Sequence, residues 1–210
     1  KEIRSVRFEA GLVFQYPEYQ LFEETVKKDI AFGPSNMGLP AEEIEARVYE
    51  AMDFVGLDRS FAEKSPFDLS GGQKRRVAIA GIIAMRPRIL ILDEPAAGLD
   101  PRGRDEILSR ICEYRSKYGA SVVMISHSME DMARYCDRIL VMNGGKVFMY
   151  GTCEEIFSEA ERLESVGLTV PQITKLMLEL KRRGFDVNTS VYTVDSAEAE
   201  IKRLLAGGAK

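Results

Sequence analysis

The amino-acid sequence predicts an α/β fold, in which helices pack on a parallel β-sheet. Two apolar runs, residues 89–92 and 121–126, have the composition of parallel strands that are buried on both faces. Between them, Asp100 and Pro101 begin a helix, because aspartate is a favoured N-cap residue and proline fits the first turn. In such a sheet, ligands bind outside the carboxyl ends of the strands.

Further elements are predicted from periodicity and turn residues on both sides of this core. Before it come a strand at residues 11–14, a polar turn at 15–18, a helix from Pro40 to Gly56 and a helix from about Gln73 to Met85. After it come a hairpin with strands at 139–142 and 146–150 around Asn143-Gly144, an amphipathic helix that Gly184 ends, a strand-like piece at 189–194 and a helix at 197–205.

Composition and charge limit the class of protein. The 210 residues are 45% hydrophobic and 30% charged, as in ordinary globular proteins, and a net charge of -4 argues against a general binder of nucleic acid phosphates. The apolar stretch at 77–85 is too short to cross a bilayer. Cys112, Cys136 and Cys153 lack the spacing of a zinc site and are expected to be free thiols in a reducing compartment.

The most informative segment is Leu69-Ser70-Gly71-Gly72-Gln73. Its two glycines allow the backbone to approach an anion closely, Ser70 supplies a hydroxyl group, and the helix that follows directs its positive end to the same place. A Ser-Gly-Gly turn before a helix is often only a capped loop. The full segment followed by three basic residues at 74–76 is much rarer by chance, so it predicts an anion site.

Two adjacent carboxylates, Asp93 and Glu94, follow the strand at 89–92 at its carboxyl end. A strand-end aspartate can hold magnesium, and an adjacent glutamate can orient or deprotonate an attacking water. A solvated acidic pair is the alternative interpretation. The apolar strand before the pair and Pro95 after it favour a site.

Two polar residues at other strand ends are weaker candidates. His127 directly follows the strand at 121–126 and is a candidate partner for a γ-phosphate oxygen. Gln15 follows the first strand and is a candidate contact for a metal ion or a water. A lone histidine is more often structural, so these assignments depend on the neighbouring motifs.

Together these segments resemble the ATPase domain of ABC proteins over about residues 11–151. The corresponding motifs are the Q-loop at Gln15, the signature at 69–73, the Walker B segment at 89–95, the D-loop at 97–100 and the switch histidine at Ser126-His127. The resemblance implies a P-loop NTPase of the ABC-ATPase fold, incomplete at the N-terminus, with an inserted helical subdomain and a small α+β C-terminal extension. It also implies a head-to-tail dimer that sandwiches two ATP molecules.

The resemblance assigns roles to individual residues as well. Catalytic roles fall to Glu94, His127 and Gln15, Mg²⁺ binding to Asp93 and Gln15, and contacts with ATP or across the dimer to Ser70, Gly71, Gly72, Gln73 and Asp100. In this arrangement Ser70 and Gly72 would contact the γ-phosphate of the ATP that the other subunit binds.

Two further segments resemble one particular group of ABC proteins. Residues 14–22 and 29–34 are similar to the A component of energy-coupling-factor (ECF) importers, the group that includes cobalt and nickel uptake ATPases. This implies an ATP-hydrolysing subunit that energises import of a vitamin or a transition-metal ion. The implied partners are a second ABC ATPase (identical or related), a transmembrane coupling subunit and a substrate-binding membrane subunit, with no nucleic acid. The implied location is peripheral, at the cytoplasmic face of the cell membrane.

The same resemblance implies that the chain consists of two parts. Residues 1–157 are expected to form the ATPase domain, with the helical subdomain at about 36–86, and residues 158–210 an extension that helps hold two ATPases together. In such importers the loop after the Q-loop glutamine docks on coupling helices of a transmembrane subunit. The side chains that would dock are Tyr16, Tyr19, Leu21 and Phe22. Packing in the local core is their alternative role.

The phosphate loop GxxxxGK[ST], which a complete ABC ATPase needs, does not occur in the sequence. We expect a fragment rather than a true truncation, and negligible ATPase activity for these 210 residues alone. Two alternatives from other classes are a soluble ABC-type ATPase that acts on DNA, and a non-catalytic dimerisation module if the truncation is real. The short interval between Gln15 and Ser70 leaves no room for the long coiled coil usual in DNA-acting proteins.

Overall fold

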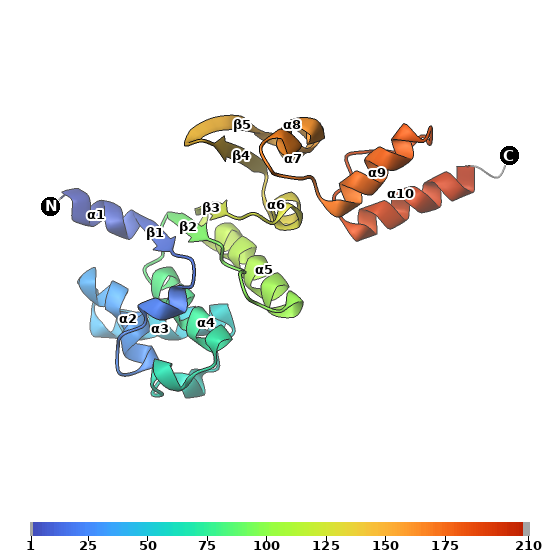
Figure 1. Ribbon diagram of the computed structural model, residues 1–210. Helices are drawn as coiled ribbons and strands as arrows, with labels where there is room; N and C mark the ends of the chain where they lie inside the picture. The colour runs from blue at the N-terminus through green and yellow to red at the C-terminus, as the bar shows by residue number, and fades with distance from the viewer. Residues whose placement is uncertain (1, 208–210) are drawn as a thin grey trace. The chain divides into compact units, whose positions relative to one another are not determined.

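The computed structural model describes residues 2–207, which divide into two compact units between Ile125 and Ser126 (Figure 1). The first unit contains α1 (Glu2–Glu9), β1 (Ala10–Val13), the 3-10 turn η1 (Pro17–Gln20), α2 (Val26–Asn36), α3 (Ala41–Val55), η2 (Arg59–Phe61), η3 (Pro66–Asp68), α4 (Gly71–Ile83), β2 (Ile89–Asp93), α5 (Pro101–Tyr118) and β3 (Ser121–Ile125). The second contains α6 (Met129–Tyr135), β4 (Arg138–Asn143), β5 (Lys146–Thr152), α7 (Cys153–Phe157), α8 (Ala160–Ser165), α9 (Gln172–Arg182) and α10 (Val194–Gly207).

A three-stranded parallel sheet in the order β1-β2-β3 forms the centre of the first unit. Val13 of β1 lies opposite Leu92 of β2, and Leu92 lies opposite Met124 of β3. The three predicted strands are confirmed, each with ends within one residue of the prediction. Because the strands are parallel, their carboxyl ends meet at one edge of the sheet.

One face of this sheet is packed and the other is exposed. Helices α4 and α5 cover one face of the sheet (Figure 1). Leu92 is fully buried. Strand β1 and α4 approach closely, since a Cβ atom at Gly11 would lie 2.5 Å from Cγ2 of Ile82. On the opposite face, Ile89 and Val123 are 42% and 49% exposed. The prediction that the strands are buried on both faces is therefore wrong for the described residues, because their helices pack on one face only.

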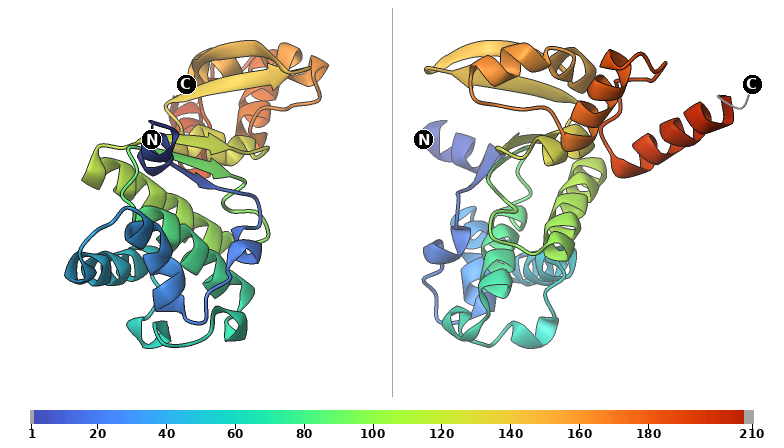
Figure 2. Two further views of the ribbon diagram at one scale, coloured as in Figure 1. Left: turned by 90° about the vertical axis from the view of Figure 1, so that its left-hand side faces the viewer. Right: turned by 45° about the vertical axis from the view of Figure 1, so that its right-hand side comes forward.

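Helices α2, α3 and α4 pack against one another below the sheet (Figure 2). The predicted helix from Pro40 to Gly56 is α3, with Pro40 as its N-cap and Gly56 ending it at a φ of 69°, where glycine is favoured. Helix α4 begins at Gly71, two residues earlier than predicted, so the glycine pair belongs to its first turn. Helix α2 was not predicted, because Pro34 interrupts its helical pattern near its end.

The second unit contains the predicted hairpin, with a different turn. The turn residues are Gly144 and Gly145, with φ values of 56° and 73°, because Asn143 still pairs with Lys146. Two consecutive positive φ values are typical of a type I′ turn, which suits two glycines. The short helices α7 and α8 that follow β5 were not predicted.

The strand-like piece predicted at 189–194 is wrong, since that segment is irregular until α10 begins at Val194. Val191 is buried, and its carbonyl oxygen accepts a hydrogen bond of 2.8 Å from Oγ1 of Thr174 in α9. A side-chain hydrogen bond thus replaces the ladder that a neighbouring strand would provide. The predicted helices on either side are present as α9 and α10.

Two apolar clusters stabilise the second unit. One includes Met129, Phe157, Leu163 and Val170, and the other is centred on Met177. The first cluster contains residues on both sides of the predicted boundary between 157 and 158, and that boundary stays a prediction. Over residues 2–207, no helix is both long and apolar enough to cross a membrane. Among the described residues, Cys112, Cys136 and Cys153 form no disulfide bond.

Candidate functional site

Three of the predicted site residues lie at the carboxyl edge of the sheet. Asp93 is the last residue of β2, Glu94 follows it, and Gln15 comes two residues after the end of β1. Adjacent strands lie about 4.8 Å apart, so the pairing of β1 with β2 brings these residues to neighbouring positions. Gln15 is exposed, whereas Asp93 and Glu94 are half-buried.

The backbone of Glu94 is in an unusual conformation, with a φ of 46°. This left-handed region costs a residue other than glycine roughly 1 kcal/mol or more, and it is frequent at functional sites. The N–H of Glu94 donates to the carbonyl oxygen of Ile125 at 2.9 Å, and its own carbonyl accepts from the N–H of Ala97 at 3.1 Å. These two hydrogen bonds fix the backbone where the chain leaves β2.

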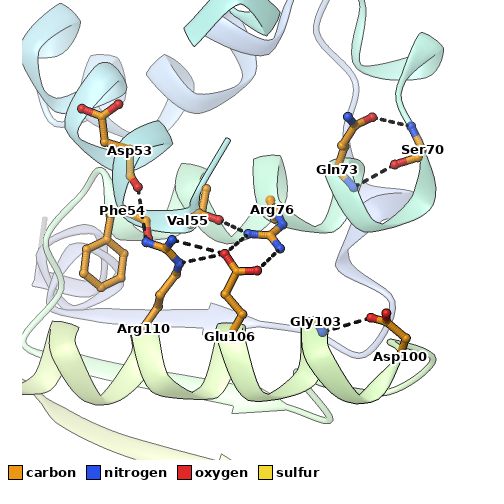
Figure 3. A network of polar contacts seen from close by, with 10 residues as sticks. All are labelled: Asp53, Phe54, Val55, Ser70, Gln73, Arg76, Asp100, Gly103, Glu106 and Arg110. Atoms are coloured by element: carbon orange, nitrogen blue, oxygen red, sulfur yellow. Dashed lines mark hydrogen bonds and ion pairs between the residues drawn. The ribbon is translucent and has the colours of Figure 1, made fainter. Parts of the chain in front are cut away.

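The signature segment forms the N-terminus of α4 (Figure 3). Oγ of Ser70 accepts from the N–H of Gln73 at 3.4 Å, and Oε1 of Gln73 accepts from the N–H of Ser70 at 2.9 Å, which is a capping box. Gly71 and Gly72 supply N–H groups that have no acceptor within the helix. Both glycines are exposed, and apart from their chain neighbours and the backbone of α4, no described atom lies within 4 Å of where their Cβ atoms would be. The end of α4 therefore presents bare N–H groups and a positive dipole, which suit a phosphate.

Asp100 begins α5, as the sequence predicts. Its Oδ1 accepts a hydrogen bond of 3.0 Å from the N–H of Gly103 (Figure 3). The residue itself is exposed. Its capping role is confirmed, and its link across a dimer stays a prediction.

His127 belongs to the second unit. It is exposed and directly precedes Ser128, whose Oγ accepts from the N–H of Asp131 at 3.2 Å and caps α6. The candidate residues are thus divided between the two units: His127 is in the second, and all the others are in the first.

A polar network fastens α4 to α3 and α5 (Figure 3). Arg76 donates to Oε1 and Oε2 of Glu106 at 3.1 and 2.9 Å, and also to the carbonyl oxygen of Val55. Arg110 donates to Glu106 and, at 2.6 Å, to the carbonyl oxygen of Phe54. The hydrogen bonds from Arg76 lower the pKa of the Glu106 carboxyl to about 2. This network holds α4 against α3 and α5.

Arg75 is a candidate that sequence reasoning missed. It is buried, and its guanidinium donates to the carboxylate of Glu18 and to the carbonyl oxygen of Ala97. The sequence contains a spacing pattern that indicates the burial of Arg75. Arg75, Ile79 and Ile83 recur every four residues, so the helical period places the arginine on the buried face of α4.

A magnesium site was predicted at Asp93 and Gln15. Within the described part of the chain, no group of three or more His, Cys, Asp or Glu side chains could hold a metal ion. Mg²⁺ does not require such a group, since it is commonly held by one or two carboxylates together with waters and substrate phosphates. The carboxylate of Asp93 and the side-chain oxygen of Gln15 fit that donor set.

A parallel sheet with paired carboxylates at its carboxyl edge, and a helix that presents Ser-Gly-Gly-Gln at its N-terminus, define a phosphate-binding α/β protein. A family model described as ABC transporter matches residues 1–97. The energy-coupling factor transporter ATP-binding protein EcfA2 of Caldanaerobacter subterraneus subsp. tengcongensis is 60% identical over 205 residues, which are 98% of this chain and 72% of that protein.

Two solved structures are similar as well. CbiO1 from Clostridium perfringens, described as part of the ABC transporter complex cbiONQ, has a TM-score of 0.69 and 41% identity, over 84% of this chain and 70% of that chain. The ATP-binding cassette MJ0796, in a dimeric post-hydrolysis state bound to ADP and Pi, has a TM-score of 0.63 and 28% identity, over 72% of this chain and 66% of that chain.

The chain belongs to the ABC transporter family, within the group of ATP-binding proteins of energy-coupling factor transporters. The predicted ABC-ATPase fold is confirmed, and so is the prediction of an ATP-binding ATPase that serves transport. These relatives do not support the alternative of an ATPase that acts on DNA.

Proposed function

We propose that the chain hydrolyses ATP at a site shared between two ATPase subunits, and so drives import of a vitamin or a transition-metal ion. The sheet edge with Asp93 and Glu94 serves the ATP of its own subunit. The N-terminus of α4, with Ser70 and Gly72, serves the γ-phosphate of the ATP that the other subunit binds. The dimeric state of the similar cassette MJ0796 supports this arrangement.

Glu94 is the proposed catalytic carboxylate. In the hydrolytic step, a water oxygen forms a bond to the γ-phosphorus, and the bond from that phosphorus to the β–γ bridging oxygen of ATP breaks. The carboxylate orients this water and accepts its proton. The observation that carries the assignment is the fixed left-handed backbone of Glu94 at the sheet edge.

The other candidate residues have supporting roles in this proposal. His127 and Ser70 contact γ-phosphate oxygens, and Gly71 and Gln73 complete the phosphate-binding end of α4. Asp93 and Gln15 would hold Mg²⁺, which neutralises charge on the phosphate oxygens when bound. Asp100 forms a link across the dimer.

The proposed partners are a second ATPase, identical or related, a transmembrane coupling subunit and a substrate-binding membrane subunit. The similarity to cbiO1, which is part of the cbiONQ complex, supports this set. The chain would then work as a peripheral protein at the cytoplasmic face of the membrane. Residues 158–210 would help hold the two ATPases together.

A groove in the first unit supports docking of the transmembrane subunit. It has a volume of about 810 Å³, and its lining includes Leu21, Phe22 and Phe32. Phe22 is 57% exposed and packs edge-on against Phe32, with the two ring centroids 4.9 Å apart. Leu21 is only 7% exposed. Tyr19 is 85% exposed. We therefore assign docking to Tyr19 and Phe22 and core packing to Leu21, with an apolar cytoplasmic helix of the membrane subunit as the occupant.

The catalytic assignment is tested with Glu94→Gln in the protein expressed from its whole gene and assembled with its membrane subunits. We expect ATP hydrolysis to fall by roughly a hundredfold or more, while ATP binding persists. Glu113→Gln is the control, because Glu113 is an exposed carboxylate on α5. Undiminished hydrolysis by Glu94→Gln would contradict the proposed function.

A further inference from the structure

Arg75 is a buried cation that joins three separate segments of the first unit. Its side chain is 4% exposed. Its Nε and Nη2 atoms donate to Oε2 and Oε1 of Glu18, both at 3.2 Å. Its Nη1 atom donates to the carbonyl oxygen of Ala97, and its guanidinium carbon lies 6.0 Å from the ring centroid of Tyr16. Every nitrogen of the guanidinium group therefore has an acceptor.

Two of these partners connect directly to candidate site residues. Tyr16 directly follows Gln15, and Tyr16 itself has a left-handed φ of 54°. Ala97 donates its N–H to the carbonyl oxygen of Glu94 at 3.1 Å. Arg75 itself lies two residues after Gln73, at the phosphate-binding end of α4.

The chemistry of arginine makes this junction stiff. A guanidinium group is planar and rigid, so it holds two carboxylate oxygens and a carbonyl oxygen in one fixed geometry. A buried charge that loses an acceptor is strongly destabilised, because water cannot replace the lost partner. The three segments therefore shift together or the hydrogen bonds break.

We propose that Arg75 is a positioning residue that couples the two ATP sites of the dimer. This rests on the proposed function, in which α4 serves the partner's ATP while Gln15 and Glu94 serve the chain's own. Through Arg75, a displacement of α4 on contact with the partner's γ-phosphate is transmitted to the backbone around Glu94. Turnover at one site then depends on occupancy of the other.

Two neighbouring arginines of α4 provide a matched test. Arg75→Lys keeps the charge but loses the fork that spans Glu18 and Ala97. Arg76→Lys makes the same chemical change one residue away, where the side chain joins α3 and α5 instead. ATP hydrolysis is measured against ATP concentration in the assembled transporter made from the whole gene, and thermal unfolding is measured on the same proteins.

We expect Arg75→Lys to lower the maximal hydrolysis rate by at least about tenfold and to bring the Hill coefficient for ATP down towards 1. Arg76→Lys should lower the unfolding temperature by a similar amount and leave the Hill coefficient unchanged. Equal hydrolysis curves for the two variants, or a Hill coefficient of about 1 in the unmodified protein, would overturn the proposal.

A second variant covers the case in which Arg75→Lys does not fold. Glu18→Gln keeps the shape of the acceptor and removes its charge, and we expect the same direction of change in the Hill coefficient. Glu94→Gln distinguishes failure of the coupling role from failure of the proposed function. If Glu94→Gln is inactive and both Arg75→Lys and Glu18→Gln hydrolyse ATP with unchanged cooperativity, only the coupling role of Arg75 fails. If Glu94→Gln is fully active, the proposed function itself fails.

Discussion

Arg76 and Glu106 form a two-point ion pair, in which both terminal nitrogens of the arginine reach the carboxylate, at 3.1 and 2.9 Å. The pair joins the second turn of α4 to the first half of α5. It therefore fixes the helix that carries the signature segment to the helix that Asp100 begins.

Acid should weaken the fold through this pair. The pKa of Glu106 is lowered from 4.5 to about 2, chiefly by the hydrogen bond from Arg76. A lowered carboxylate pKa stabilises the fold above the unfolded value, and this contribution is lost as the pH falls through the folded value. We expect the free energy of unfolding to decrease between pH 4.5 and about 2, and Glu106→Gln to remove part of that slope. The effect is modest, because the Glu106 side chain is 38% exposed and solvent screens it.

Chemical denaturation across that pH range measures the effect. Glu113→Gln, on the same helix and exposed, serves as the control and should leave the slope unchanged. A slope that is identical in Glu106→Gln and the unmodified protein would contradict the prediction.

Substitutions at Ser70 should separate helix capping from phosphate binding. Asn and Asp both cap helices well, so Ser70→Asn and Ser70→Asp should each keep the unfolding temperature close to the original, whereas Ser70→Ala should lose about 1 kcal/mol. Only Ser70→Asp places a negative charge where the γ-phosphate is proposed to bind. We expect it to reduce ATP hydrolysis far more than Ser70→Asn does. Similar hydrolysis by the two variants would argue against a phosphate contact at Ser70.

Gly72 should show opposite effects on stability and activity. It lies in the first turn of α4, with open space around its missing Cβ, so Gly72→Ala should raise stability by roughly 0.5 kcal/mol. The added methyl group covers the N–H surface that the phosphate needs, so hydrolysis should fall. Gly38→Ala is the contrasting control, because a φ of 78° makes alanine unfavourable there, and it should lose stability without losing activity. Normal ATP hydrolysis by Gly72→Ala would contradict the prediction that phosphate binding requires glycine at this position.

Phe22→Asp should weaken transporter assembly and leave the ATPase folded. Phe22 is more than half exposed and lines the groove in the first unit, so a charge there costs little in the free subunit but opposes an apolar helix. Phe67→Asp is the control, since Phe67 is 62% exposed and is not part of the groove lining. Co-purification with the transmembrane subunit measures assembly. Equal recovery of both variants with that subunit would count against the docking assignment.

Elements with a local chemical signal could be predicted from the sequence. Asp100 before proline marks the start of α5, Gly56 marks the end of α3, and apolar runs mark β2 and β3. The strand-like piece at 189–194 was not predicted correctly, because β-branched and aromatic residues do not show whether a partner strand exists. There, Thr174 takes the carbonyl of Val191 instead.

For the candidate site, too, local features could be predicted and long-range contacts could not. The residues at the sheet edge and in the signature could be chosen from motifs, because strand ends and helix starts are local features. The contact of Arg75 with Glu18 joins residues 57 positions apart, and nothing in either local segment indicates the other. The conformation of Glu94 could not be predicted from its own segment either, since its N–H donates to Ile125 on the next strand.

The left-handed backbone at Glu94 also determines which amino acids the position tolerates. In a library of all substitutions there, glycine and asparagine should relieve the backbone and increase folded yield, while β-branched residues should reduce it. None of these residues carries the carboxylate that hydrolysis is proposed to need. Selection for folded yield and selection for ATP turnover would therefore enrich different residues at this position. Only selection for turnover would enrich glutamate.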